Sequence, residues 1–68
     1  INFSLDLNIS NAIVYLPSNT TIGGNIDINT ASTLNAPAGD ISIAGNISKH
    51  STATFNNGVA TYSEYKES

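Results

Sequence analysis

The sequence contains no cysteine and no arginine, and only seven of its 68 residues carry a charge. Without cysteine, neither a disulfide nor a Cys/His metal site can be built. The net charge of −3 argues against a basic surface for nucleic acid. No apolar run approaches the roughly 20 residues that a membrane-spanning helix needs. We therefore expect no nucleic-acid partner and no membrane span.

The length of the chain sets a second limit. Sixty-eight residues allow one domain, and a chain of this size buries only about 60% of its unfolded surface, so its core is small. The chain begins at Ile1 and not at a methionine. We expect it to have been processed or cut from a longer polypeptide.

The residues that are abundant favour strands and turns. Asn, Ser and Thr make up 26 of the 68 residues, and Ile makes up nine. β-branched residues favour strands, whereas Asn and Gly favour tight turns. No segment carries the sustained apolar repeat at i, i+3, i+4 and i+7 that a helix would show. The sequence predicts an all-β fold.

Apolar and polar residues alternate in short bursts. Between Phe3 and Ile9 every second residue is apolar, which predicts one half-buried strand. Turn signals such as Pro17-Ser18-Asn19 and Gly23-Gly24-Asn25 follow at short intervals. The strands should therefore be only four to six residues long.

The chain resembles itself after a shift of about 21 residues, and a fixed period of this kind is typical of solenoids. The shift places a shared pattern of Ile, then Gly-Asn-Ile, then Thr-apolar-Asn in register. We predict a short β-solenoid (β-helix) of about three coils, as a single segment over residues 1–68, with coils at approximately 1–21, 22–42 and 43–63 and a tail at 64–68.

Stacked coils would bring equivalent residues into ladders spaced by about 4.8 Å. We expect two apolar ladders inside the tube and two amide ladders at its corners, where Asn tolerates a left-handed backbone. A pair of glycines should supply the positive φ of a sharp corner. The predicted structural ladders are Ile1, Ile22 and Ile43; Leu5, Ile26 and Ile47; Gly24 and Gly45; Asn25 and Asn46; Asn35 and Asn56.

Three charged segments fit this pattern less simply. Lys49 falls on the apolar position of Ile28, so the coil either bulges outward there or shifts its register by one residue. The tail holds three of the seven charges and is either a fraying end or a cap. Asp6 and Asp27 fall in register. If they stack, their carboxylates would repel each other or share a cation; the alternative is that both point into solvent.

Residues for catalysis are sparse. His50 is the single histidine, and a triad drawn from Ser51, His50 and Asp40 has no distinguishing spacing. Catalysis needs converging groups with tuned pKa values. We predict no catalytic, cofactor-binding or metal-binding residue and do not expect an enzyme.

One part of the chain resembles a known kind of repeat. The residues are Thr33-Leu34-Asn35-Ala36, Gly39-Asp40-Ile41-Ser42-Ile43-Ala44-Gly45-Asn46-Ile47-Ser48 and Thr54-Phe55-Asn56-Asn57-Gly58. This segment resembles the repeats of large secreted surface adhesins of Bacteroidetes-type bacteria, and is similar in style to filamentous-haemagglutinin-type adhesins. It departs from them where Ile47 replaces a frequent aromatic and where Lys49-His50 interrupts a polar stretch. The resemblance implies a solenoid at the cell surface, but no particular ligand.

We therefore expect an extracellular or cell-surface structural and adhesive segment of a larger surface protein or fibre. Its partners would be neighbouring coils of the same chain, surface glycans or another protein. The alternative is a small subunit that stacks with identical subunits into a cytoskeletal or viral-fibre type of filament. The two ends of the stack discriminate between them, because a filament subunit needs complementary ends.

Overall fold

The structure, a computed structural model, describes residues 2–67, and all regular secondary structure in this range is β. The ten strands are two to four residues long, shorter than the sequence pattern predicts. They are β1 (Asn2–Phe3), β2 (Leu7–Ile9), β3 (Ile13–Tyr15), β4 (Thr21–Ile22), β5 (Ile26–Ile28), β6 (Thr33–Ala36), β7 (Ser42–Ile43), β8 (Ile47–Lys49), β9 (Thr54–Asn57) and β10 (Tyr65–Glu67).

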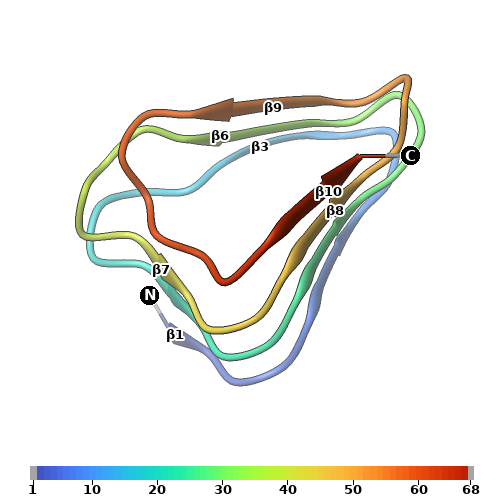
Figure 1. The fold of residues 1–68 in the computed structure, drawn as a ribbon. Coiled ribbons are helices and arrows are strands. Elements are labelled where there is room, and N and C mark those ends of the chain that lie inside the picture. The colour runs from blue at the N-terminus through green and yellow to red at the C-terminus, as the bar shows by residue number, and fades with distance from the viewer. Residues whose placement is uncertain (1, 68) are drawn as a thin grey trace.

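The strands form three parallel sheets that the chain visits in a fixed order. The first sheet has the order β1-β4-β7, the second β10-β8-β5-β2, and the third β3-β6-β9. We call β1–β3 the first passage, β4–β6 the second and β7–β9 the third. Viewed along the stack, the three sheets form the sides of a triangle (Figure 1). After the third passage, Thr61 bridges to Ser42 of the first sheet and β10 joins the second sheet.

The interior is built from side chains that point inward from all three sheets. Ile26 and Ile28 on β5 are buried, and Asp27 between them is not, as period-two alternation requires. The second passage lies between the other two and contributes most of the fully buried side chains, among them Ile22, Ile26 and Leu34. The core consists of Ile9, Leu16, Ile22, Ile26, Ile28, Leu34, Ala36, Ile41, Ile43, Ile47, Ala53 and Ala60.

The register spacing is not uniform along the stack. Between the second and third passages, the sequence numbers of paired residues such as Ile26 and Ile47 differ by 21. Between the first and second passages, the difference is 19 in the first and second sheets and larger by one in the third. Counted between register partners, the first passage is shorter by one residue from β2 to β3. It is shorter by one more from Tyr15 to Thr21, whose partners are Asn35 and Ser42. Its predicted 21-residue register is therefore wrong.

Two predicted ladders change members as a result. Phe3, and not Ile1, pairs with Ile22; Ile1 lies outside the described residues. Leu7, and not Leu5, pairs with Ile26, while Leu5 is 77% exposed. A displacement of two residues preserves the alternation of faces, so Leu7 takes the position predicted for Leu5 and packs against the core.

The predicted strand over residues 3–9 is also wrong, because it is broken into β1 and β2. Ser4 and Leu5 form a bend between these strands, and the chain turns there from the first sheet to the second. Alternation continues across the bend in sequence, so the pattern alone conceals it.

The left-handed backbone positions lie elsewhere than predicted. Asn11, Asn19 and Ala31 have positive φ, and no described glycine does. The expected positive φ at Gly24 and Gly45 is therefore wrong, as is a left-handed backbone at Asn25 and Asn46. Asn35 and Asn56 lie within β6 and β9, and not at a corner as predicted.

Candidate functional site

A polar ladder runs along the corner between the first and second sheets, and we call it the corner ladder (Asp6, Asn25 and Asn46). The backbone N–H of Asn25 donates to Asp6 Oδ1 at 2.8 Å, and the N–H of Asn46 donates to Asn25 Oδ1 at 2.8 Å. Each side chain thus accepts from the backbone of the next passage. The predicted amide pairing between Asn25 and Asn46 is in fact a side-chain to backbone bond.

Gly24 and Gly45 make this ladder sterically possible. A Cβ on Gly24 would overlap the Asp6 carboxylate, and a Cβ on Gly45 would overlap the Asn25 side-chain oxygen. The N–H of Gly45 also donates to the carbonyl of Gly24 at 3.0 Å. Their role is therefore close approach between passages, which only a residue without Cβ permits.

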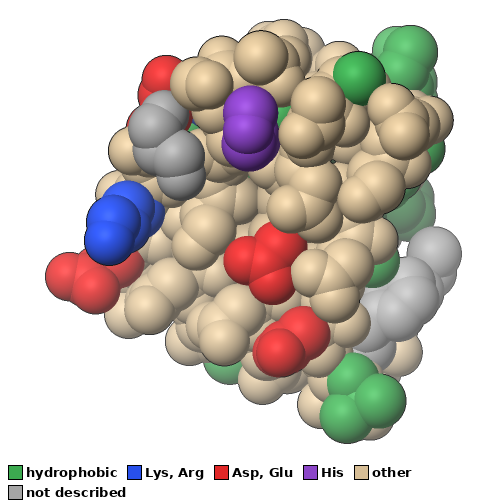
Figure 2. Space-filling view, turned by 90° about the vertical axis from the view of Figure 1, so that its right-hand side faces the viewer, with side chains coloured by type: hydrophobic (Ala, Val, Ile, Leu, Met, Phe, Trp, Pro, Cys, Tyr) green, Lys and Arg blue, Asp and Glu red, His purple; other side chains and the backbone are tan. Residues whose placement is uncertain are grey.

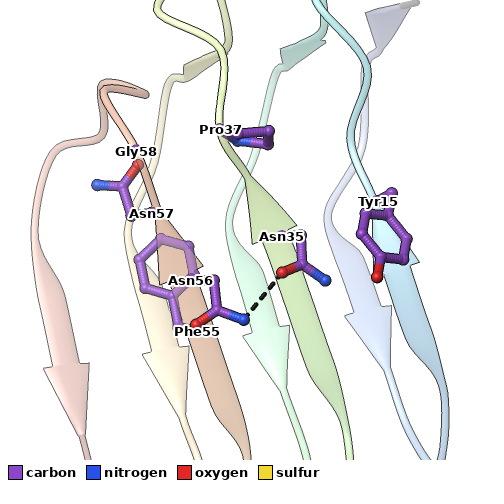
Figure 3. A pocket seen from close by; sticks show the side chains of 7 residues that line it. All are labelled: Tyr15, Asn35, Pro37, Phe55, Asn56, Asn57 and Gly58. Atoms are coloured by element: carbon purple, nitrogen blue, oxygen red, sulfur yellow. Dashed lines mark hydrogen bonds between the residues drawn. The ribbon is translucent and has the colours of Figure 1, made fainter.

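A second ladder lies on the outer face of the third sheet and borders a groove. Tyr15 pairs with Asn35, which pairs with Asn56, and Asn56 Nδ2 donates to Asn35 Oδ1 at 2.8 Å. Figure 3 shows these three side chains standing on neighbouring strands. The open groove has a volume of ≈ 520 Å³ and is lined by Tyr15, Asn35, Pro37, Phe55, Asn56, Asn57 and Gly58. An exposed ring beside fixed amides suits weak contacts with a polar partner.

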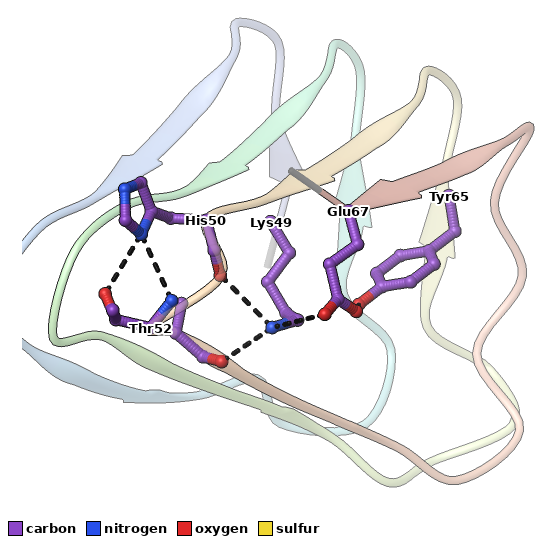
Figure 4. Close-up of polar contacts among 6 residues, drawn as sticks. Lys49, His50, Thr52, Tyr65 and Glu67 are labelled. Carbon is purple, nitrogen blue, oxygen red and sulfur yellow. Dashed lines mark hydrogen bonds and ion pairs between the residues drawn. The ribbon is translucent and has the colours of Figure 1, made fainter.

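Lys49 is buried inside the C-terminal end of the stack. Its ammonium donates to the carbonyl of Ala53 at 2.7 Å and of His50 at 3.1 Å, and lies 3.5 Å from Glu67 Oε2 (Figure 4). The residue is 8% exposed and pairs in register with Ile28. Because Lys49 keeps its register with Ile28, the chain neither bulges nor shifts there. The three acceptors compensate the burial of its charge.

Aromatic rings close the same end. Phe55 follows Leu34 in register, and Tyr65 follows Ile47. The Phe55 ring stacks on Tyr65 with centroids 5.4 Å apart, and meets Tyr62 edge-on at 6.1 Å. Together with the Lys49–Glu67 pair, these residues cover the interior, and we call them the C-terminal cap (Lys49, Phe55, Tyr62, Tyr65 and Glu67). The tail, left open as a fraying end or a cap, is a cap.

The cap gives a pH-dependent prediction. Two effects raise the pKa of Tyr65 above its usual value of about 10. The larger is partial burial, and the second is the hydrogen bond from the Tyr65 hydroxyl to Glu67 Oε1 (3.1 Å). A raised folded-state pKa contributes stability that is complete below pH 10 and is lost as the pH rises through the folded value. We expect Tyr65→Phe to reduce the fall in melting temperature above pH 10. Equal alkaline slopes for the two chains would contradict this.

The structure separates the acids that were candidates for a cation site. Asp27 pairs in register with Asn8 and Ser48, while Asp6 belongs to the corner ladder, so their predicted register is wrong. Within residues 2–67, no three His, Cys, Asp or Glu side chains lie close enough to hold a metal ion. His50 Nδ1 accepts from the backbone N–H of Thr52 at 3.1 Å, as part of a local turn.

The outer face of the second sheet is polar and carries one acidic and one basic residue at its outward strand positions. Its outward positions on β2, β5, β8 and β10 hold Asn8, Asp27, Ser48 and Lys66. Figure 2 shows this side of the molecule, where a few charged side chains lie scattered among uncharged polar atoms. This face does not concentrate charge of either sign.

The sequence left the tail open as a fraying end or a cap, and did not identify the register partners of its residues. Tyr65 pairs with Ile47, and Thr61 pairs with Ser42, at spacings shorter than the 21-residue shift. Ile26, Ile47 and Tyr65 are successive register partners on the second sheet. An alignment that allowed a shorter spacing after Ile47 would have placed Tyr65 next in this series. The signal for Lys49 was present, since its position matched Ile28, but the burial of its charge depends on carbonyls that only the folded turn presents.

Comparisons with known proteins found no matching family model, no matching curated protein and no matching solved structure. Among the described residues, no helix is long and apolar enough to cross a membrane.

Proposed function

We propose that this chain is a short β-solenoid of about three coils with a repeat of about 21 residues, and that it serves as a structural and adhesive segment of a larger extracellular surface protein or fibre. The observation that carries the proposal is the continuity of the three parallel ladders over one apolar interior. A stack of this kind has contacts mainly between neighbouring passages, and so extends by repetition.

The mechanical role follows from the bonding. Each passage is tied to the next by backbone bonds in three sheets and by the corner ladder. Pulling one passage from the next therefore breaks bonds on all three sides of the triangle. The outer faces remain free for display, and the groove beside Tyr15, Asn35 and Asn56 offers the contact face on which adhesion would rest.

The alternative of a filament of identical stacked subunits is less well supported. Head-to-tail stacking would pair β2 of the next copy with β10. Leu7 of that copy would then lie next to Tyr65, and Ile9 next to Glu67. The Glu67 carboxylate, which pairs with Lys49, is about half exposed, and an apolar neighbour stacked on it would desolvate the pair without adding a hydrogen bond. The cap therefore argues against growth from this end.

Lysine accessibility tests the proposed location. The chain has two lysines, of which Lys66 is exposed on β10 and Lys49 is buried. We expect a membrane-impermeant amine reagent, added to intact cells that make the protein, to modify Lys66 and to leave Lys49 largely unmodified. Peptide mass spectrometry after digestion measures both sites.

Lysed cells and a cytoplasmic marker protein provide the controls. The marker should remain unmodified in intact cells and become modified after lysis. If Lys66 reacts only after lysis, the extracellular location is wrong. Equal modification of Lys49 and Lys66 in native material would instead contradict the buried position of Lys49.

A further inference from the structure

We propose that the groove on the outer face of the third sheet, beside Tyr15, Asn35 and Asn56, binds a neutral oligosaccharide. The Tyr15 ring would stack on the flat face of one sugar ring, and the two amides would bond to neighbouring hydroxyl groups. This inference rests on the proposed function and deepens it, because it assigns a ligand class to the face on which adhesion would rest.

The Tyr15 ring is presented to solvent. It is 73% exposed, and it takes part in none of the ring contacts found among residues 2–67, whereas Tyr62 and Tyr65 pack against Phe55. The face of an aromatic ring carries partial negative charge and attracts weakly polarised C–H groups. A ring exposed in this way therefore suits the C–H groups on the flat face of a sugar.

Asn35 and Asn56 present donors and acceptors in fixed positions. Asn56 Nδ2 donates to Asn35 Oδ1 at 2.8 Å, and this bond orients both side chains. Because an amide has two N–H donors and an oxygen with two lone pairs, Asn35 Nδ2 and Asn56 Oδ1 retain capacity for a ligand. Figure 3 shows Asn35 Nδ2 on the side towards Tyr15. A hydroxyl group both donates and accepts, so it matches either end of this amide pair.

The lining of the groove selects an uncharged ligand. None of its residues carries a charge at neutral pH. A phosphate, carboxylate or ammonium group placed there would lose hydration without gaining an opposite charge. Hydroxyl groups lose less, because the amides replace their water partners.

The groove is formed before a ligand arrives. Its volume of ≈ 520 Å³ lies within the range of about 300–1,000 Å³ that is typical of small-molecule sites. β6 and β9 pair over four positions beneath it, and Gly58 lies so close to Pro37 that a Cβ on Gly58 would overlap the Pro37 carbonyl oxygen. Such a floor loses little conformational freedom on binding.

A peptide is the competing ligand class, because its backbone also donates and accepts. Extended peptides bind sheets mainly by adding a strand to an edge, where backbone groups are unpaired. The middle strand under the groove, β6, is paired on both sides, with β3 and with β9. The face above it therefore offers side chains alone, which favours a ligand whose hydroxyl groups project from a flat ring.

Titration of the purified chain with four neutral oligosaccharides tests the proposal. The probes are cellotetraose, maltotetraose, mannotetraose and N-acetylated chitotetraose, and binding is followed by NMR of the nitrogen-labelled chain. We expect at least one of them to shift the side-chain amide signals of Asn35 and Asn56. The dissociation constant should be millimolar, since one stacked ring and a few hydrogen bonds are weak in water. Tetragalacturonate, an acidic tetrasaccharide, should cause no shift.

Variants in the groove and beside it separate binding from folding. Tyr15→Ala should weaken binding at least about fivefold, while Tyr15→Phe should retain most of it because the ring remains. Asn35→Ala should weaken binding by a similar factor, because the amide pair is lost. Ile13→Ala is the matched control, since Ile13 is also exposed on β3 but does not line the groove, and its affinity should be unchanged. Thermal unfolding verifies that each variant is folded.

Three results would overturn the proposal. The first is that none of the four sugars shifts the signals of Asn35 and Asn56, and the second is that Ile13→Ala loses as much affinity as Tyr15→Ala. The third is that the uncharged peptide acetyl-Ser-Gly-Asn-Ser-amide shifts these signals where the sugars do not, which would assign the groove to a protein partner. The titrations use the purified chain, whereas labelling of Lys66 on intact cells tests the extracellular location, so either can fail without the other.

Discussion

Replacing Ile26 with Asp is expected to abolish the folded state. Ile26 is fully buried on β5, between Leu7 of the first passage and Ile47 of the third. Removing a buried Ile side chain costs about 2–5 kcal/mol, and an unpaired carboxyl in its place adds a further penalty. The sum, roughly 5 kcal/mol or more, approaches the whole stability of a domain of this size. Strand content by circular dichroism and thermal unfolding measure the outcome.

The matched control is Ile13→Asp. Ile13 is also in a strand and bears the same side chain, but it is 68% exposed. The same charge there should change the free energy of unfolding by less than about 1 kcal/mol. Ile26→Val, which removes one methylene, should cost about 0.5–1.5 kcal/mol and keep the fold measurable. Native melting of Ile26→Asp would show that Ile26 does not lie in a packed interior.

Composition and alternation were enough to predict the class of fold. Short bursts of Ile separated by Gly, Asn and Pro indicate strands and turns, and the structure is all-β with parallel strands in stacked sheets. The 21-residue shift aligned Ile26 with Ile47 and Asn35 with Asn56, which the structure also pairs. These contacts were accessible because the second and third passages have turns of equal length.

The first passage could not be aligned in the same way. Its turns are shorter, and the displacement of two residues moved Leu5 onto a position that Leu7 occupies. Because both are leucines with the same parity, neither hydropathy nor alternation distinguishes the two registers. The corner ladder supplies the missing information, since Asp6 pairs with Asn25 through a side-chain bond that no residue count reveals.

The cap was hidden for a different reason. Tyr62 and Tyr65 are separated from the preceding passage by a shorter connection than the repeat predicts. Lys49 was visible as an exception at an apolar position, but sequence cannot show that the carbonyls of His50 and Ala53 converge on its ammonium. Ends of a repetitive structure break the repeat, so a method based on the repeat loses accuracy there.

Replacing Gly45 with Ala is expected to destabilise the corner between the first and second sheets. Its Cβ would lie 2.7 Å from the Gly24 carbonyl oxygen and 2.9 Å from the carbonyl carbon, in addition to overlapping the Asn25 side chain. A side chain can rotate away, but the Gly24 backbone is held by the N–H of Gly45 itself. The two passages must therefore separate, at a cost of about 3 kcal/mol, the upper part of the range for overpacking. Urea unfolding measures this loss.

Gly39→Ala separates this effect from the general cost of adding a methyl group. The Cβ at Gly39 would meet only the side chain of Val59, at 3.0 Å, and Val59 is exposed and free to move. Neither glycine has positive φ, so backbone strain is the same in both variants. We expect Gly39→Ala to change the free energy of unfolding by less than about 1 kcal/mol, with any gain coming from the stiffer unfolded chain. Equal losses for the two variants would mean that the passages are not in close contact at Gly45, and the corner ladder would lose its steric basis.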